Sequence, residues 1–436
     1  MTDAVHDSTT ARQPPGQRIA VIGAGIAGLA SAYLLNRRHA VTLFENAAYL
    51  GGHTNTVDVT LDGQTGPVDT GFLVFNDRTY PNLIALFDEL GVASHASDMS
   101  FGVTLDNGRF EWAGTNIDTV FAQRSNLLSP RFIGMLRDIL CFNAAAQVNL
   151  AAAEASGNTL GQLLDAGNYS QAFREGYLLP MAAAIWSSAP GDILRFPAAT
   201  FLRFCLNHAL LQVNNRPQWR SVVGGGREYV RRIAATLPDI RLQAGVAAVA
   251  RDVDGVVVHS TNGAERFDAV VFATHAPTTL ALLQDADERE ANMLGAVRYQ
   301  PNTAVLHADT RFLPRRRKVW SAWNYLGGAV IDGQRPVCVS YLINALQQLP
   351  FTSPVIVTLN PYSEPDPARV FARFNYEHPL LDHAAIAAQQ QLPALQGRNR
   401  AWFAGAWTGY GFHEDGLKSA LRVAADFDVL PAWARS

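Results

Sequence analysis

The apolar residues of this chain follow two spacings, one typical of strands and one typical of helices, which alternate near the N-terminus. From Arg18 the sequence runs Ile-Ala-Val-Ile without a polar residue, which is typical of a parallel strand buried on both faces. Apolar residues then recur at helical spacing over residues 26–36, and residues 40–45 predict a second buried strand. This order of strand, helix and strand indicates an α/β fold with a parallel sheet.

The rest of the chain divides into a helical part and a strand-rich part. Residues 80–211 are mostly helical in period, with interruptions at Pro130, Asn158, Pro180 and Pro190. Short β-branched runs follow and predict strands. These predicted strands are residues 246–250, 256–259, 268–273, 303–308, 319–325, 337–342, 355–359 and 401–404.

Two helices are predicted near the C-terminus. One covers residues 384–392, and a closing helix begins at about Gly416 and continues over residues 417–427. A helix-rich block therefore lies between pieces of α/β sequence. We predict that one domain is inserted into another, rather than that the domains follow in series.

Composition excludes several classes of protein. The chain is 48% hydrophobic and 17% charged, which excludes intrinsic disorder for most of its length. Its formal net charge of −3 argues against binding to nucleic acid or to polyanions in general. No apolar run is long enough for a transmembrane helix. Residues 1–17 are polar and are expected to form a tail rather than a signal peptide.

The cysteine pattern bears on compartment and on metals. Cys141, Cys205 and Cys338 lie far apart and form no CxxC pair, which excludes a disulfide framework and a zinc ribbon. His378 and His383 show no metal-ligand spacing and are expected at the surface, so no metal site is predicted. A cytoplasmic location is expected.

The strongest motif is Gly23-Ala24-Gly25-Ile26-Ala27-Gly28, which lies between the first strand and the first helix. Gly23 permits a tight turn, Gly25 lets the backbone approach a pyrophosphate, and Gly28 lets the helix pack closely on the strand. Glu45 closes the second strand, where a carboxylate can accept hydrogen bonds from ribose hydroxyls. The combination predicts a dinucleotide site.

Further glycine turns favour FAD over NAD. Gly51-Gly52-His53 follows Glu45 closely and offers a second stretch of bare backbone, for which a nicotinamide dehydrogenase has no evident use. Thr70-Gly71-Phe72 is another turn after a strand. Gly405 and the loop at residues 411–416 precede the closing helix, whose N-terminus could face a reduced flavin.

These motifs resemble the flavin-containing amine oxidoreductase superfamily, which includes monoamine and polyamine oxidases and phytoene-desaturase-like enzymes. The resemblance extends over nearly the whole chain. Within the superfamily, Trp323–Tyr325, Ser340–Asn344 and Gly411–Gly416 are similar to bacterial FAD-binding proteins that accompany cyclopropane-fatty-acid synthases.

The resemblance implies a division of the chain into two domains. The FAD-binding domain would comprise residues 18–76, 218–290 and 395–436, and the mixed α+β substrate domain would comprise residues 77–217 and 291–394. It also implies non-covalent FAD, with the pyrophosphate at the first two glycine loops and adenine at Val246. The residues expected to contact FAD are Gly23, Gly25, Ile26, Ala27, Gly28, Glu45, Gly51, Gly52, His53, Thr70, Gly71, Phe72, Val246, Gly405, Gly416 and Leu417.

The chain departs from the amine oxidases of this superfamily. They usually have a lysine that holds a water near flavin N5, but the only lysines here are Lys318 and Lys418, and Asn302 or His307 more nearly occupies that region. The Glu that often follows the C-terminal Ala-Gly is replaced by Ala406. The resemblance therefore implies an FAD-dependent oxidoreductase that transfers a hydride from a substrate C–H bond to flavin N5, on a lipid acyl chain rather than an amine.

Candidate residues for catalysis lie beside the closing helix and on the later strands. They are His413, Glu414, Asp415, Asn324 and Tyr341, with Tyr325 and Asn344 as further wall or proton-handling groups. Glu414 and Asp415 are equally consistent with helix capping. Two alternatives remain open: an amine or polyamine oxidase, and a non-catalytic FAD-bearing partner of a cyclopropane-fatty-acid-synthase-like methyltransferase.

Two segments raise the question of contact with the inner membrane surface. Arg315–Lys318 is a basic run that could meet anionic lipid headgroups or could be a solvated loop. Phe196–Trp219 is rich in Phe, Leu and Trp, which is consistent with a membrane-surface helix and with core packing.

Overall fold

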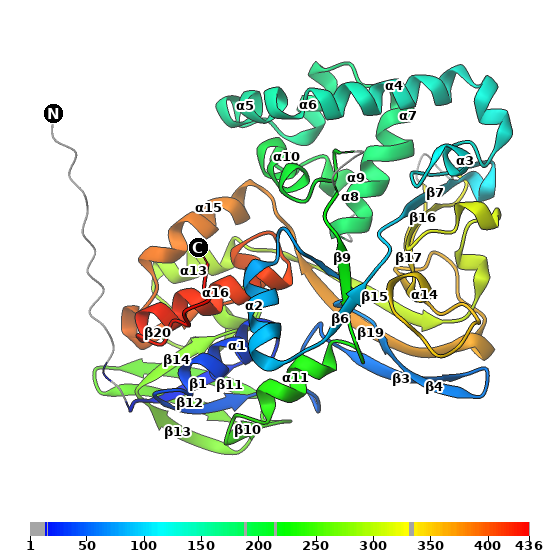
Figure 1. Ribbon diagram of the computed structural model, residues 1–436. Helices are drawn as coiled ribbons and strands as arrows, with labels where there is room; N and C mark the ends of the chain where they lie inside the picture. The colour runs from blue at the N-terminus through cyan, green and yellow to red at the C-terminus, as the bar shows by residue number, and fades with distance from the viewer. Residues whose placement is uncertain (1–13, 15, 187–189, 213–215, 331–334, 436) are drawn as a thin grey trace.

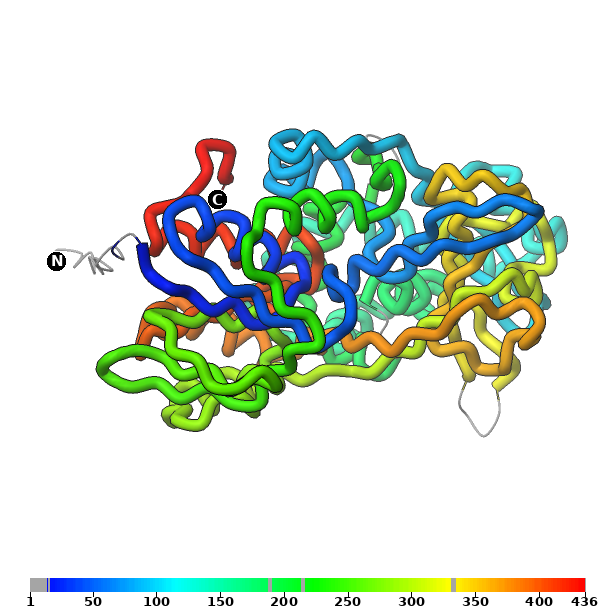
Figure 2. Tube along the Cα trace, turned by 90° about the horizontal axis from the view of Figure 1, so that it is seen from below, coloured from blue at the N-terminus to red at the C-terminus, as the bar shows by residue number. Residues whose placement is uncertain are grey.

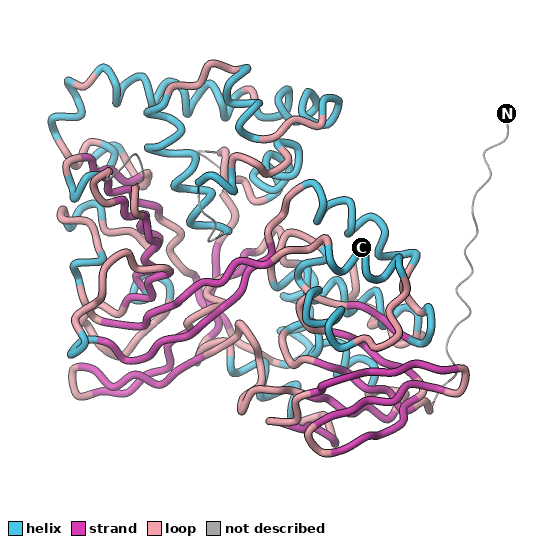
Figure 3. Tube along the Cα trace, turned by 180° about the vertical axis from the view of Figure 1, so that it is seen from behind, coloured by secondary structure: helices cyan, strands magenta, loops and turns pink. Residues whose placement is uncertain are grey.

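Two large sheets and a layer of helices make up the computed structural model, which describes residue 14 and residues 16–186, 190–212, 216–330 and 335–435. A five-stranded parallel sheet lies at the lower left of Figure 1, and a seven-stranded mixed sheet lies at the right. The helical layer follows the upper edge in Figures 1 and 3. Within these described ranges, no helix is long and apolar enough to cross a membrane.

The parallel sheet has the strand order β10-β2-β1-β14-β20, and every neighbouring pair is parallel. Alternate residues of its first strand enter different hydrophobic clusters, with Ile19 and Val21 on one face and Ala20 and Ile22 on the other. Both faces are therefore buried, as the unbroken apolar run predicted. The strands are β1 (Arg18–Ile22), β2 (Ala40–Phe44), β10 (Asp239–Arg241), β14 (Ala269–Phe272) and β20 (Ala401–Phe403).

Different layers cover the two faces of this sheet. Four helices cover one face, and two of them, α1 (Ile26–Leu35) and α16 (His413–Asp426), pack together although they come from opposite ends of the chain. Figure 2 shows the same neighbourhood of blue and red segments. The other members of this layer are α2 (Pro81–Leu90) and α11 (Arg227–Ala234). The opposite face carries β11 (Val246–Asp252), β12 (Gly255–Ser260), β13 (Gly263–Phe267), α12 (Ala276–Leu282), α13 (Glu288–Gly295) and α15 (His383–Gln391).

The second sheet has the order β19-β15-β18-β17-β16-β7-β8 and is antiparallel except where β16 meets β7. Its strands are β7 (Phe101–Leu105), β8 (Phe110–Ala113), β15 (Tyr299–His307), β16 (Trp323–Gly327), β17 (Val337–Leu342), β18 (Ile356–Leu359) and β19 (Val370–Pro379). The helical layer above it contains α3 (Ile117–Val120), α4 (Pro130–Ala144), α5 (Ala146–Ser156), α6 (Leu160–Ala166), α7 (Gln171–Phe173), α8 (Leu179–Trp186), α9 (Pro190–Ile193) and α10 (Ala198–Asn207). The short helix α14 (Ile343–Leu346) follows β17 and lies away from this layer, at the lower right of Figure 1.

Two small sheets connect the halves of the molecule. One is the antiparallel hairpin of β3 (Thr56–Leu61) and β4 (Gln64–Asp69). The other has the order β5-β9-β6 and contains β5 (Phe75–Asn76), β6 (Ser94–Ala96) and β9 (Trp219–Val222).

The structure confirms the α/β class and the inserted, mixed second domain, but it corrects some predicted elements. Residues 80–211 are not helical throughout, because β6, β7 and β8 lie within them. The turn between β7 and β8 contains Asn107, at φ 54°, followed by Gly108 at φ 84°, a pair of residues typical of hairpin turns. The strand predicted at residues 319–325 begins only at Trp323. Helix α10 buries six of its residues, four of them in the hydrophobic core, so this described part of the Phe196–Trp219 segment serves core packing.

A buried carboxylate, Asp69, joins three of these parts at the end of β4. It accepts two hydrogen bonds from the main-chain amide of Gly226, at 2.9 and 3.1 Å, and one from Gln347 Nε2 at 2.8 Å. Thr56 of the neighbouring strand donates a further bond. Burial raises the pKa of Asp69 to about 6 in spite of these donors. Asp69 therefore fixes the hairpin, the start of α11 and the end of α14 relative to one another.

We expect Asp69→Ala to lower the free energy of unfolding by about 2–4 kcal/mol, because it leaves a buried amide and a buried side-chain amide without an acceptor. Asp252→Ala is the matched control, since Asp252 also accepts main-chain bonds but is exposed in its ion pair with Arg266. It should cost no more than about 1 kcal/mol. Urea titration of both variants measures the difference, and equal losses would contradict the role given to Asp69.

Candidate functional site

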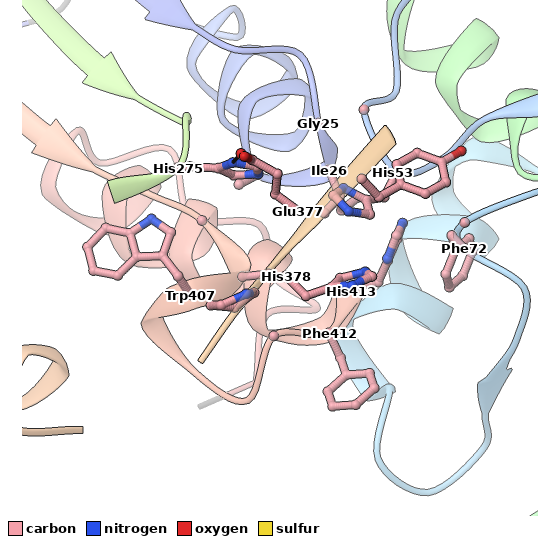
Figure 4. Close-up of a pocket in the computed structure, with 18 of the residues that line it drawn as sticks. Gly25, Ile26, His53, Phe72, His275, Glu377, His378, Trp407, Phe412 and His413 are labelled. Atoms are coloured by element: carbon pink, nitrogen blue, oxygen red, sulfur yellow. Dashed lines mark hydrogen bonds and ion pairs between the residues drawn. The ribbon is translucent and has the colours of Figure 1, made fainter. Parts of the chain in front are cut away.

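A cavity of about 850 Å³ runs from the glycine turn after β1 into the second domain. Turns and loops of the parallel-sheet domain form one side of its wall, and several strands and helices of the second domain form the rest. Figure 4 shows part of this wall. Its size is typical of sites for large cofactors or ligands. The wall residues predicted from the sequence are Gly23, Gly25, Ile26, Ala27, Glu45, Gly51, Gly52, His53, Thr70, Gly71, Phe72, Val246, Gly405, Tyr341 and His413.

Of the three glycines in the first turn, only Gly25 has open space beside it. Gly23 has φ +98°, and a Cβ there would lie 2.8 Å from the carbonyl oxygen of Ala273. A Cβ on Gly28 would lie only 1.8 Å from the carbonyl oxygen of Gly23, so this residue permits close packing of α1 and does not line the cavity. A Cβ on Gly25 would meet no protein atom within 4 Å. Gly25 therefore faces the open space in front of the α1 N-terminus, where an anion is favoured.

The second glycine loop lies directly against the first. The amide of Gly51 donates to the carbonyl of Ala24 at 2.8 Å, and Gly52 approaches Gly25 so closely that a Cβ would lie 3.2 Å from the Gly25 Cα. Gly52 also has φ +58°, a conformation that favours glycine. The two loops thus form one surface of bare backbone, as their proximity in the sequence predicted.

Glu45 lies at the carboxyl end of β2, on the wall of the same cavity. Its Oε2 accepts from the amide of Ala24 at 2.8 Å, and its Oε1 accepts from the amide of Ala47 at 2.8 Å. The carboxylate is therefore held at the edge of the glycine turn, where its free lone pairs remain available to hydroxyl donors. Val246, at the start of β11, lines the cavity nearby.

Three buried polar atoms on the wall lack a partner among the described residues, namely His53 Nε2, Trp323 Nε1 and Trp407 Nε1. Buried polar groups are nearly always paired in folded proteins, so unpaired ones on a cavity wall indicate a polar ligand. We call the bare backbone and open space at Gly25 the cradle. Together with the cradle, the unpaired atoms show that the wall fits a dinucleotide. No three His, Cys, Asp or Glu residues of the described chain are arranged to hold a metal ion.

Helix α16 begins at His413, three residues earlier than the sequence predicted. The amide of Gly416 is therefore used inside the helix, where it donates to the carbonyl of Phe412 at 3.0 Å. A Cβ on Gly416 would lie 2.8 Å from Ile26 Cγ2, so this glycine lets α16 approach α1. Gly416 and the buried Leu417 lie behind the cavity wall rather than on it.

The two acidic residues of this first turn bind main-chain amides. Glu414 accepts from the amide of Asn82 at 3.1 Å and from the amide of Leu83 at 2.9 Å, so it caps helix α2. Asp415 accepts from the amide of Phe412 at 2.9 Å and caps its own helix. Burial raises the pKa of both carboxyls, that of Asp415 to about 6. Both are outside the cavity lining, which matches the capping alternative.

His413 itself lines the cavity. Its ring stacks on Phe72 with centroids 3.6 Å apart and planes at 18°, and its Nε2 lies 2.8 Å from the hydroxyl of Thr54. Tyr229 is a second, longer partner of that nitrogen at 3.3 Å. Burial lowers the pKa of His413 to about 3, so the ring is neutral at physiological pH.

Three more histidines surround the glycine loops, and two of them, His275 and His378, were not predicted as site residues (Figure 4). His53 stacks on Tyr376 at 4.9 Å, and its ring centroid lies 5.2 Å from that of His378. His275 contacts Glu377 at 3.1 Å. Burial and mutual repulsion lower the pKa of His53 well below its usual range, and burial lowers that of His378 to about 4. The expectation that His378 is a surface residue was wrong.

A chain of amides fixes the tautomer of His378. Asn302 Oδ1 accepts from Asn360 at 2.7 Å, so Asn302 Nδ2 is left to donate to His378 Nδ1 at 2.9 Å. His378 Nδ1 is therefore an acceptor, and the ring proton is on Nε2. A spacing pattern could not reveal this residue, because β19 brings it to the cavity from a distant part of the sequence.

The other end of the cavity is apolar. Its wall contains Met99, Ile185, Trp186, Phe204, Leu210, Trp219, Trp323, Tyr341, Leu359, Tyr410 and Phe412, which we call the aromatic chamber. Only two acidic residues, Glu45 and Glu377, and no Arg or Lys, are among the described residues of the whole lining. The chamber is therefore suited to an uncharged, apolar group.

Several candidates lie away from the chamber. Asn324 forms hydrogen bonds with the main chain of Ser321 and Ser340. Asn344 accepts from the amide of Val355 and donates to two carbonyls. Neither residue lines the cavity, and the buried Tyr325 does not line it either. Tyr341 does line it, and its hydroxyl donates to the carbonyl of Ala184 at 3.2 Å.

The residues considered for the N5 region are also outside the wall. Asn302 acts through His378, and His307 Nε2 lies 2.8 Å from the hydroxyl of Thr358. Lys318 forms an ion pair with Asp118 at 2.8 Å on the surface. Lys418, the other lysine of the sequence, lies on α16, so the described wall contains no lysine.

Comparison with known proteins agrees with this fold. Residues 21–90 match the family model of an NAD(P)-binding Rossmann-like domain. No curated protein matches the chain. Among solved structures, it is similar to a fatty acid isomerase from P. acnes that produces CLA, with 16% identity, a TM-score of 0.68, and coverage of 94% of this chain and 98% of that one.

Two amine oxidases are similar to the same extent. Putrescine oxidase bound to putrescine has 16% identity and a TM-score of 0.66, over 95% of this chain and 99% of its own. Cyclohexylamine oxidase from Brevibacterium oxydans IH-35A has 17% identity and a TM-score of 0.65, over 95% and 100%. The chain therefore has the two-domain fold of the amine oxidases.

We expect Gly25→Val to fold normally but to lose its affinity for a dinucleotide. Gly25 has φ −71° and ψ −177°, which any residue adopts, and its Cβ would clash with no protein atom. The added side chain would instead occupy the space in front of the α1 N-terminus. Titration of the apoprotein with FAD, followed by flavin fluorescence, should show a loss of at least about tenfold.

Gly134→Val is the matched control, because a Cβ at Gly134 also meets no atom within 4 Å but lies on α4, outside the cavity lining. Unchanged FAD affinity in Gly25→Val, with normal melting, would show that this opening does not receive the dinucleotide.

We expect the free energy of unfolding to fall as the pH drops below about 6.5. The reason is that the buried histidines bind protons in the unfolded chain at a pH at which they stay neutral in the folded protein. For His378, with a pKa of about 4 in the folded state, this loss is about 2 kcal/mol between pH 7.5 and 5. His378→Gln should remove it, whereas His259→Gln, at an exposed position, should not. Urea titrations at the two pH values measure both, and an unaltered slope in His378→Gln would contradict the assignment.

Proposed function

We propose that this protein is an FAD-dependent oxidoreductase that acts on an apolar substrate. The observation that carries the proposal is that one continuous cavity joins the bare-backbone cradle at Gly25 to the aromatic chamber. A dinucleotide that begins at the cradle would extend toward His413 and Phe412, where the chamber opens. A substrate in the chamber would then meet the redox-active end of the cofactor.

Bound FAD would supply a two-electron acceptor, which takes a hydride from a substrate C–H bond and is later reoxidised by oxygen or a redox partner. The protein's own residues would orient the reactants and exclude water. Phe72 and the neutral His413 form a stacked pair on the wall, and Trp323 and Tyr341, which also line the cavity, pack edge to face in the chamber. A fixed apolar wall of this kind holds a reacting carbon in one position.

His378 is the best placed group for moving a proton. Its Nδ1 is engaged by Asn302, its Nε2 carries the proton, and burial keeps the ring neutral. A neutral imidazole can donate at Nε2, although its low pKa makes it a weak base at neutral pH. Its neighbours His53, His275 and Glu377 are the other titratable groups at this part of the wall.

The chamber supports a lipid acyl chain as the substrate. Its described wall is made of aliphatic and aromatic side chains and has no charged residue to bind an ammonium group. The similar fatty acid isomerase has a substrate of this class, whereas putrescine is a cation at neutral pH and would need a carboxylate nearby. The absence of a lysine on the wall is a further difference from the amine oxidases that the sequence resembles.

The test is anaerobic mixing of the flavin-loaded protein with phospholipids, fatty acids, polyamines and nicotinamide nucleotides, followed by absorbance of the flavin and analysis of the products. We expect acyl lipids, and not amines, to bleach the flavin. Bleaching by a polyamine would assign an amine oxidase. A flavin that no compound reduces, in a protein that copurifies with a lipid methyltransferase, would support the non-catalytic partner.

Met99→Glu tests the chamber separately from the cofactor. Because it places a carboxylate on the apolar wall, turnover of an acyl substrate should fall at least about tenfold while flavin content stays the same. Leu430→Glu is the control, since Leu430 is 51% exposed and outside the lining. Equal acyl turnover in both variants would place the substrate elsewhere.

A further inference from the structure

Exposed aliphatic side chains are concentrated on one short part of the surface. Thirteen large hydrophobic residues of the described chain are exposed, and six of them lie between residues 117 and 148. Leu128 is 91% exposed and Ile117 is 80% exposed, so neither contributes to packing. Exposed residues in such a concentration mark an interaction surface, whereas scattered ones need no explanation.

Five of these six residues lie on three consecutive elements of the chain. Helix α3 and the 3₁₀ turn Arg124–Leu128 lead directly into α4, and Phe121 and Phe132 pack beneath them with ring centroids 5.7 Å apart. Along α4, the exposed residues Ile133, Arg137 and Leu140 follow helical spacing. We call Ile117, Leu127, Leu128, Ile133 and Leu140 the aliphatic ridge.

Basic side chains surround the aliphatic ridge. Arg124, Arg131 and Arg137 have exposed fractions of 61%, 70% and 81%. The basic run predicted from the sequence lies beside them, because Lys318 and Arg124 both form ion pairs with Asp118 of α3. In that run the guanidinium of Arg317 lies over the ring of Trp320.

The local charge is opposite in sign to that of the whole chain. Residues 106–144 and 315–318 contain eight basic and four acidic residues, although the chain as a whole has a net charge of −3. Two of the four acids, Glu111 and Asp138, have side chains that are only 0% and 14% exposed. Glu111 is paired with Arg316, so by this count the surface keeps an excess of four positive charges.

We propose that the aliphatic ridge docks on the surface of an anionic lipid bilayer. Aliphatic side chains that protrude within a basic border can enter the boundary of headgroups and acyl chains while the arginines contact the phosphates. A second copy of this chain fits less well, because a symmetric dimer would bring two positive surfaces together. The ridge also lacks the exposed aromatic residues that dominate protein interfaces.

The position of the ridge agrees with this assignment. Figure 1 shows α4 along the upper edge of the molecule, with the parallel sheet at the opposite, lower side. The inner face of α4 belongs to the same hydrophobic cluster as Trp186 and Phe204, which line the aromatic chamber. Docking would thus turn the helical layer of the chamber toward the bilayer. Docking of this kind depends only on the surface residues and not on the identity of the substrate.

The test is flotation of the full-length, flavin-loaded protein with vesicles of phosphatidylcholine, or of an equal mixture of phosphatidylcholine and phosphatidylglycerol. We expect binding to the mixed vesicles only, and its loss in high salt. Ile117→Ser with Leu128→Ser should lower the partition coefficient at least about tenfold, because two aliphatic side chains no longer enter the bilayer. Arg137→Ser with Arg317→Ser should lower it about tenfold as well.

Two exposed residues of the parallel-sheet domain supply matched controls. Val253→Ser removes an aliphatic side chain that is 87% exposed, and Arg231→Ser removes an arginine that is 67% exposed. Neither should change vesicle binding. Absence of binding, or equal losses in the controls, would overturn the proposal. A protein that is dimeric in sedimentation velocity, and monomeric only after the Ile117 and Leu128 changes, would overturn it in favour of a second copy.

Discussion

Carboxylates that accept hydrogen bonds from main-chain amides hold this site together; two of them, Asp69 and Glu414, are buried, and the third, Glu45, is half-buried. Glu45 binds the amide of Ala24, Asp69 binds that of Gly226, and Glu414 binds those at the start of α2. Each bond joins segments that are far apart in the sequence. The amides of Ala24, Gly226, Asn82 and Leu83, of which only that of Ala24 is on the cavity wall, need acceptors whether or not a ligand is present. These three side chains supply them without entering the aromatic chamber.

The sequence was most informative where local geometry decides the residue type. Gly23, Gly25 and Gly28 were each predicted with a distinct role, and the close approaches at Gly23 and Gly28 bear these roles out. The sequence was least informative where pairing between distant strands decides which residues reach the cavity. His378 reaches the cavity because β19 pairs with β15, and no local pattern records that register. Glu414 directly follows the cavity residue His413 in the sequence, yet only the fold reveals that its carboxylate binds the start of α2.

The two ends of the cavity differ in the way they treat charge. At the cradle, glycine backbone and the α1 N-terminus favour an anion without any Arg or Lys on the described wall. Around the cradle the histidines are neutral, because burial and mutual repulsion oppose their protonation. The chamber contributes shape and exclusion of water. An arrangement of this kind suits chemistry in which no charged group of the substrate needs a counterion.

The packing of α1 against α16 has a consequence for synthesis on the ribosome. The glycine on which Ile26 packs, Gly416, is made about 390 residues after Ile26. Strand β1 must also wait for β14, which is made 250 residues later, before that edge is paired. The nascent chain therefore carries an open strand edge and an uncovered helix until these partners have been made, and such segments are prone to aggregation. The order of the elements thus delays the covering of these segments during synthesis.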